Sequence, residues 1–277
     1  MYFYPPPRHI LAMVAIVLVV LLIVGHGLGL YSHGLGLLAG EGSILLLTLI
    51  MARRYRMPAE DLLLLNATRL PVLGLAVVAA VGASLAIGQL AILFNQVLHY
   101  FDSGMPLYFQ RELLEVGVAR TWPELGWRLV TVGLAPGLCE EIFFRGLIFT
   151  GLYVHWGPKL ALAGSALLFA LVHPSPWQLP ALFSFGVFLG LLVYWTHSLY
   201  PAVIAHATNN LIYLGEINLR AHTGVAWLAD DLSLVTLVGS LLLLVGSLLL
   251  LRRYPPLLPL TPAMPNRQPA LLAGRHA

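Results

Sequence analysis

Charged side chains are scarce in this sequence. Lys, Arg, Asp and Glu make up 10% of the 277 residues, whereas a soluble domain usually carries about 25%. Hydrophobic residues reach 59%, and the mean hydropathy is +0.85. Most of the surface of such a chain cannot face water, so the composition excludes a soluble protein and predicts an integral membrane protein.

Cysteine is nearly absent as well. The one cysteine, Cys139, excludes an intramolecular disulfide and a zinc site built from several cysteines. The formal net charge is only +3, which is too small to indicate a nucleic-acid partner. Long polar stretches are also lacking, so we expect a single membrane domain over residues 1–253 and a short, proline-rich flexible tail over residues 254–277.

Long apolar runs dominate what is present. About 20 apolar residues cross a bilayer, so the fold class is all-α, a polytopic transmembrane helix bundle. Pro136 and Gly137 should kink the fourth span or split it into a short entry helix and a main helix from about Leu138. Residues 99–126 are expected to form an amphipathic linker at the membrane interface. We expect eight spans, near residues 10–30, 35–52, 70–98, 127–153, 158–173, 179–197, 200–216 and 232–251.

The basic residues indicate how the bundle is oriented. With eight spans both termini lie on one side of the membrane, and the loops of that side hold most of the Lys and Arg. They are Arg8, Arg53, Arg54, Arg56, Arg69, Lys159, Arg252, Arg253, Arg267 and Arg275. The loops of the other side hold Arg111, Arg120, Arg128 and Arg220. Because positive charge favours the cytoplasmic side, we expect both termini in the cytoplasm, and the short loops favour a multi-pass protein of a prokaryotic plasma (inner) membrane.

Charges inside the fourth span need an explanation. Glu140, Glu141 and Arg145 lie in the run APGLCEEIFFRGLIF, and each charge near the centre of a spanning helix costs about 2.5–3.5 kcal/mol. Glu141 and Arg145 are four residues apart and predict a structural ion pair on one helix face. Glu140 points about 100° away from Glu141 and has no partner on its own helix.

Two more spans carry polar pairs at the same spacing. Phe169 and His173 share one helix face, as do His206 and Asn210. Taken singly, these residues fit an interfacial histidine or hydrogen bonds between helices. Together with the acidic pair they supply what peptide hydrolysis requires, namely a base for water and donors for the oxyanion. A carboxylate in apolar surroundings also binds a proton more readily than one in water, which suits a general base.

These motifs resemble a known family. The segments EEIFFRG, FALVH and HATNN are similar to the EExxxR, FxxxH and HxxxN signatures of the CAAX protease and bacteriocin-processing family, in the same order. The resemblance covers about residues 127–216. It implies an intramembrane endopeptidase similar to the type II CAAX prenyl endopeptidases, acting on a membrane-tethered or prenylated peptide or protein.

The resemblance also implies residue roles. Glu140 and His173 would activate the attacking water, and His206 and Asn210 would stabilise the oxyanion. The supporting residues would be Glu141, Arg145 and Phe169.

The use of a metal ion is left open by the sequence. No HExxH motif is present, so no helix offers the usual pair of histidine ligands. A metalloprotease site in which Glu140, His173 and His206 hold zinc and leave one position open is the alternative. We favour activation of water without a metal.

Two functions of other classes compete with the peptidase. The first is a non-catalytic immunity or partner-binding protein on the same scaffold, which would be expected to have lost a motif residue. The second is a small transporter or proton relay, which would usually place its acids at several depths. The motif set is complete and clustered here, and the two halves of the chain show no repeat of the kind found in many transporters. These observations favour the peptidase.

Overall fold

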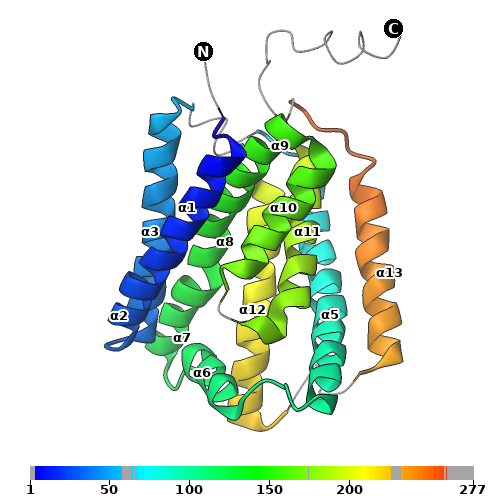
Figure 1. Cartoon of the computed structure of the whole chain (residues 1–277). Coiled ribbons are helices and arrows are strands. Elements are labelled where there is room, and N and C mark those ends of the chain that lie inside the picture. Colours follow the sequence, from blue (N-terminus) through cyan, green and yellow to red (C-terminus); the bar gives the residue numbers. More distant parts are fainter. Residues whose placement is uncertain are drawn as a thin grey trace, which may run out of the picture.

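The computed structural model describes residues 4–57, 64, 66–173, 175–225, 232–258 and 260. Its regular elements are helices, with no strand among the described residues, and Figure 1 shows them packed side by side as one bundle. The all-α, polytopic fold class is therefore confirmed. Most of the proline-rich tail, from residue 261 onward, lies outside the described residues.

Each of the eight expected spans coincides with a helical segment. These segments are Pro7–Gly29, in which α1 (Pro7–Val20) and α2 (His26–Gly29) flank a π-helical turn, α3 (His33–Arg54), α5 (Leu70–Tyr100), a long helix from Trp122 to Trp156, α10 (Pro158–Leu171), α11 (Leu179–Thr196), α12 (Tyr200–Thr223) and α13 (Leu234–Leu251). Five of them are long and apolar enough to cross a membrane by length and composition. Those five are Pro7–Gly29, α3, α5, the helix Pro176–Thr196 that contains α11, and α13. The count of eight spans remains a prediction, because the other three segments are either short or carry charges.

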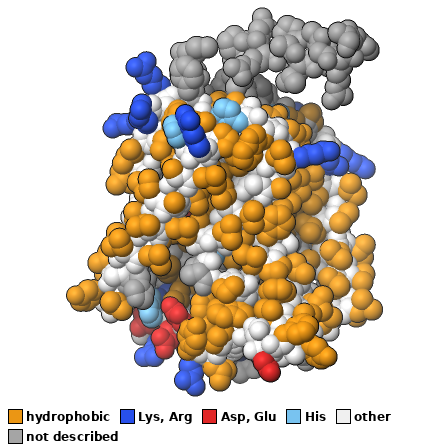
Figure 2. Space-filling view, in the orientation of Figure 1, with side chains coloured by type: hydrophobic (Ala, Val, Ile, Leu, Met, Phe, Trp, Pro, Cys, Tyr) orange, Lys and Arg blue, Asp and Glu red, His pale blue; other side chains and the backbone are white. Residues whose placement is uncertain are grey.

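The surface has the pattern of a membrane protein. Hydrophobic side chains cover the middle of the molecule in Figure 2, while Lys and Arg gather toward its two ends. The helix α1 begins and α13 ends at the same end of the bundle (Figure 1). This arrangement agrees with two termini on one side, and their cytoplasmic location stays a prediction.

The helix from Trp122 to Trp156 is continuous through Pro136. Its α-helical parts are α7 (Trp122–Arg128), α8 (Ala135–Glu141) and α9 (Thr150–Trp156), and they are joined by π-helical segments at Leu129–Leu134 and Ile142–Phe149. Proline has no N–H for the usual bond to the residue four positions earlier. The widened turn just before Pro136 absorbs this loss, so the expected split of the fourth span does not occur.

The helix α10 is short, and this sets the depth of the second motif. Its 14 residues rise about 21 Å at 1.5 Å per residue, less than the roughly 30 Å of a bilayer core. The chain turns back after Leu171, and a 3-10 turn at Pro176–Gln178 packs against α5. Trp177 Nε1 donates to the Ser103 carbonyl at 3.1 Å. The turn after His173 is therefore held against α5 and the segment that follows it.

The expected amphipathic linker contains one helix, α6 (Leu107–Gly117), which lies across one end of the bundle (Figure 1). Polar contacts tie it to α12. Tyr213 Oη donates to the Leu113 carbonyl at 3.0 Å, and Asn218 Nδ2 donates to the Gly117 carbonyl at 3.1 Å. These contacts close the bundle at the end opposite to the termini.

Candidate active site

A buried carboxylate joins the first motif to the third. Glu141 and Arg145 are both 0% exposed. Glu141 Oε1 accepts a hydrogen bond from Arg145 Nη1 at 2.9 Å, so the ion pair expected from the sequence forms. The same oxygen accepts from His206 Nδ1 of α12, also at 2.9 Å. Glu141 is thus shared between a residue of its own helix and a residue 65 positions further along.

The second motif packs into this group through Phe169. The Arg145 guanidinium carbon lies 4.7 Å from the centroid of the Phe169 ring, a cation–π contact. The Phe169 ring also meets the His206 ring edge-on, with centroids 5.9 Å apart, and the His173 ring at 4.9 Å. Residues from all three motifs therefore meet around one buried point.

Arg145 also reaches a fourth helix. Its Nη2 donates to the Gly186 carbonyl of α11 at 2.9 Å. A Cβ on Gly186 would lie 2.9 Å from Ala166 Cα, so the absence of a side chain allows α10 and α11 to pack closely. This packing holds the carbonyl where the buried guanidinium can use it. Arg145 consequently links the long helix to α10 and α11.

His173 is held in one tautomer by its own helix. Its Nδ1 lies 2.8 Å from the Phe169 carbonyl, and a carbonyl can only accept, so Nδ1 carries the hydrogen. In the neutral ring Nε2 then has a free lone pair. A half-buried histidine in this state has the form that a base for water requires.

His206 is oriented in a similar way. Its Nδ1 donates to the Glu141 carboxylate, and its ring also stands edge-on to Phe185, with centroids 5.4 Å apart. No hydrogen bond engages Nε2 among the described residues. The neutral ring therefore accepts at Nε2, and only the protonated ring donates there. His206 was expected to stabilise the oxyanion, and its contact with Glu141 means that it can donate through Nε2 only when the ring is protonated.

Asn210 lies one turn beyond His206 and is held weakly. Its Nδ2 donates to the Gly133 carbonyl at 3.4 Å, and its Oδ1 accepts from Asn209 at 3.4 Å. Asn209 in turn accepts from Ser84 of α5 at 2.8 Å. Bonds of 3.4 Å are long for an amide, so a stronger acceptor can replace the Gly133 carbonyl.

Glu140 faces a different neighbour. It interacts electrostatically with Glu41 of α3, and the two residues are 8% and 7% exposed. Oε2 of each carboxyl is buried without a hydrogen-bond partner among the described residues. The separation of Glu140 from the Glu141 and Arg145 pair agrees with its angular position on the helix.

Glu41 is not among the site residues expected from the sequence. The sequence could have indicated it. Glu41 is the one charged residue in the apolar run 35–52, and an acid in a spanning segment is a functional candidate.

The arrangement does not fit the alternative zinc site. Within the part of the chain that the structure describes, no three His, Cys, Asp or Glu side chains form a group that could hold a metal ion. Nδ1 of His206 and Nδ1 of His173 are engaged with Glu141 and the Phe169 carbonyl, which leaves Nε2 of each ring available, but Glu140 is not grouped with the two rings. The three ligands proposed for zinc are therefore not assembled around one point.

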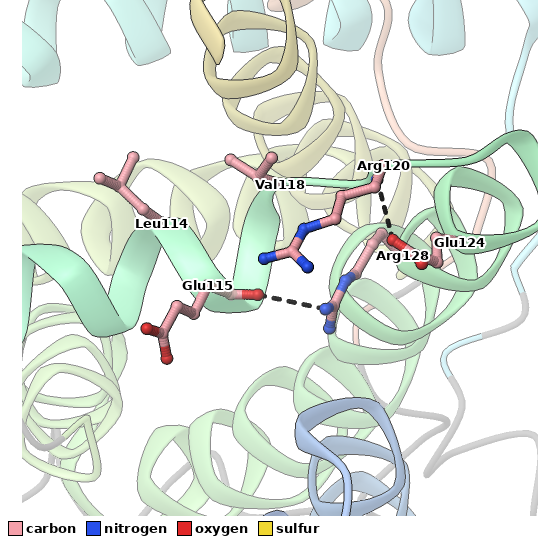
Figure 3. Close-up of a pocket in the computed structure, with 6 residues that line it drawn as sticks. All are labelled: Leu114, Glu115, Val118, Arg120, Glu124 and Arg128. Atoms are coloured by element: carbon pink, nitrogen blue, oxygen red, sulfur yellow. Dashed lines mark hydrogen bonds between the residues drawn. The ribbon is translucent and has the colours of Figure 1, made fainter. Parts of the chain in front are cut away.

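A surface hollow of about 540 Å³ lies apart from these residues (Figure 3). It is lined by Leu114, Glu115, Val118, Arg120, Glu124 and Arg128. Arg128 Nη2 donates to the Glu115 carbonyl at 3.1 Å, and the Arg120 backbone N–H donates to Glu124 at 2.8 Å. No motif residue lines it, so the hollow is separate from the candidate site.

The comparison with protein families agrees with this geometry. Residues 122–212 match the model of the type II CAAX prenyl endopeptidase Rce1-like family, a family of proteases. These residues contain all three motifs and reach from α7 into α12, so the resemblance noted in the sequence is confirmed. No curated protein and no solved structure matches the chain. The long apolar helices identify an integral membrane protein, and its residues 122–212 are similar to a family of proteases.

Proposed function

We propose that the chain is an intramembrane endopeptidase that cleaves a membrane-associated or lipidated, CAAX-like peptide. The observation that supports this most directly is the sharing of Glu141 between Arg145 and His206, with the Phe169 ring packed on both and on His173. Three weak motifs on separate helices thereby meet at one buried place inside the segment that is similar to a family of proteases.

Glu140 and His173 are assigned to the water. A base removes a proton from the water as its oxygen attacks the carbonyl carbon of the peptide bond, and the proton is then returned to the leaving nitrogen as the C–N bond breaks. The free lone pair on His173 Nε2 and the carboxylate of Glu140 can each take this proton. Their joint action requires both groups to reach one water molecule.

His206 and Asn210 are assigned to the oxyanion. Asn210 would exchange its long bond to the Gly133 carbonyl for a bond to the developing negative charge. His206 would donate from Nε2 in its protonated form. The Glu141 carboxylate beside Nδ1 offsets the positive charge that this form places inside the protein. Arg145 and Phe169 keep Glu141 and His206 in place.

A peptide-cleavage assay tests the function. We expect the full chain, purified and reconstituted in lipid vesicles, to cleave members of a library of membrane-tethered peptides with and without a prenyl group, with products located by mass spectrometry. His173→Ala should lower the rate by about 10²–10⁴-fold, because a general base contributes that much. A matched assay with a chelator, followed by zinc, reports metal dependence. Absence of cleavage across the library, or full activity of His173→Ala, would contradict the proposed function.

The location belongs to the same proposal. The peptidase would act in the plasma membrane with both termini in the cytoplasm, as the basic loops indicate. Reporters fused after Ala277 test this, one active only in the cytoplasm and one active only outside the cell. We expect signal from the cytoplasmic reporter alone, and signal from the external reporter alone would overturn the orientation.

A further inference from the structure

The hollow beside α6 and α7 has the size of a binding site. The residues that line it come from the last turn of α6, from the link that follows and from α7. Its volume of about 540 Å³ is within the range of small-molecule sites, about 300–1,000 Å³. The hollow can therefore hold a group larger than a water molecule or a single ion.

The link between α6 and α7 is fixed to α12, so the hollow has a defined shape. The Ala119 backbone N–H donates to Asn218 Oδ1 at 2.7 Å, and Nδ2 of the same asparagine donates to the Gly117 carbonyl at 3.1 Å. The Ala119 carbonyl accepts from His222 Nε2 at 2.7 Å. The side chain of Arg120, the next residue, therefore starts from a backbone that α12 holds in place.

Two guanidinium groups point into this hollow side by side (Figure 3). The Arg120 side chain makes no hydrogen bond among the described residues. Arg128 donates from Nη2 to the Glu115 carbonyl at 3.1 Å, while its Nε is buried without a partner in the described part of the chain. Neither arginine forms an ion pair within that part. Two like charges that face one hollow repel each other, and an anion between them would remove this repulsion.

The two glutamates that line the hollow do not supply this anion. Glu124 Oε2 accepts from the Arg120 backbone N–H at 2.8 Å, and the Glu115 carboxylate points away from both guanidinium groups in Figure 3. The donors of the two arginines are therefore available to an anion from outside the chain.

The position of the hollow indicates which anion it meets. The helices α6 and α7 lie at the end of the bundle opposite to the termini (Figure 1). Trp122 of α7 is 85% exposed, as is typical of tryptophan at the level of the lipid headgroups. Beyond Arg128 the same long helix exposes the apolar side chains of Leu129, Val130 and Leu134. A phospholipid places its phosphate directly above its acyl chains, which matches this order of charged and apolar groups.

We propose that the hollow binds the phosphate group of a membrane phospholipid. Arg120 and Arg128 donate to the phosphate oxygens, a geometry for which the fork of a guanidinium is suited, and the acyl chains lie along the apolar side chains that follow Arg128. The site does not depend on the proposed peptidase function, because its residues lie outside the three motifs.

A lipid-binding measurement tests the site. The full chain is purified in a detergent that contains no phosphate, depleted of native lipid and titrated with phosphatidylglycerol, and native mass spectrometry gives the Kd. We expect binding of phosphatidylglycerol but not of a diacylglycerol with the same acyl chains, which lacks the phosphate. Arg120→Gln should raise the Kd by about 10–100-fold, the contribution of a hydrogen bond to a charged group.

Arg111→Gln is the matched control. Arg111 is an exposed residue of α6 that does not line the hollow, so this variant removes the same charge from the same end of the bundle and should keep the wild-type Kd. The melting temperature reports the fold. Because the Arg120 side chain has no partner among the described residues, Arg120→Gln should melt like the wild type without lipid. It should lose the rise in melting temperature that bound phosphatidylglycerol gives the wild type.

Four results would overturn the proposal. The first is an equal Kd for the wild type and Arg120→Gln. The second is an equal loss in Arg111→Gln and Arg120→Gln, which would reflect the general charge of this surface. The third is binding of the diacylglycerol as tight as that of phosphatidylglycerol. The fourth is inorganic phosphate binding as tightly as the lipid, which would assign the hollow to a soluble phosphate. Peptide cleavage enters none of these measurements, so failure of the proposed function would leave the lipid site standing.

Discussion

Glu140→Gln is expected to abolish peptide cleavage and to leave the fold intact. An amide cannot take a proton from water, so the contribution of a general base, about 10²–10⁴-fold in rate, should disappear. Glutamine has nearly the same shape as glutamate, so the packing between α3 and α8 is preserved. The rate is measured in vesicles with the peptide that the wild type cleaves, and the melting temperature in detergent reports the fold.

A second buried glutamate provides the comparison. Glu216 is 8% exposed on α12, and its Oε1 accepts from Arg220 Nη2 of the same helix at 2.9 Å. Glu216→Gln makes the same chemical change outside the three motifs and should keep the wild-type rate. Equal rates for the two variants would refute the assignment of Glu140 to the water. A melting temperature that falls only in Glu140→Gln would assign that residue to stability instead.

The helical architecture could be predicted because the membrane leaves few choices. Apolar runs of spanning length must satisfy their backbone polar groups internally, which a helix does, and each expected span coincides with a helical segment. The path of the helix at Pro136 was harder to predict from the sequence. Proline removes one hydrogen bond wherever it stands in a helix, but the choice between a break and a widened turn depends on how neighbouring helices hold the chain. Here α12 packs against the widened turn and α8, and the helix stays continuous.

Contacts within one helix could be predicted, and contacts between helices could not. The Glu141 and Arg145 pair follows from a spacing of four residues, and it forms at 2.9 Å. The bond from His206 to the same carboxylate depends on the depth and rotation of α12 relative to α8. Apolar runs define neither quantity, since their ends are uncertain by several residues.

The position of His173 along the membrane normal was also hard to predict from the sequence. The expected spans 158–173 and 200–216 end and begin at opposite membrane faces, so they place His173 at one face and His206 near the other, which would keep the two side chains apart. The structure removes this difficulty, because the Phe169 ring of the short α10 touches both histidines. The run 158–173 is shorter than a full span, so its length already indicated a short helix.

Arg145→Met is expected to destabilise the protein by about 3–5 kcal/mol, because breaking a buried ion pair leaves the remaining charge without compensation. The variant strands the Glu141 carboxylate at 0% exposure and removes the bond to the Gly186 carbonyl and the cation–π contact with Phe169. Unfolding in denaturant, in a fixed detergent, measures the loss. The partly exposed counterpart is Arg220, whose side chain is 39% exposed in its pair with Glu216. Arg220→Met should cost less than Arg145→Met, because water reaches this pair and screens the charge that remains.

The double variant Glu141→Gln with Arg145→Met decides whether the charge or the packing of Arg145 holds the helices together. If the uncompensated carboxylate causes the loss, its removal should restore a large part of the stability, and the double variant should be more stable than Arg145→Met alone. If the contacts of the guanidinium with Gly186 and Phe169 dominate, the double variant should be no more stable than the single one. Activity should stay low in both variants. In the double variant His206 loses its carboxylate partner, and in Arg145→Met that carboxylate loses the cation that neutralises it. Recovery of stability without recovery of cleavage would therefore separate the structural role of Arg145 from the catalytic role of the carboxylate beside His206.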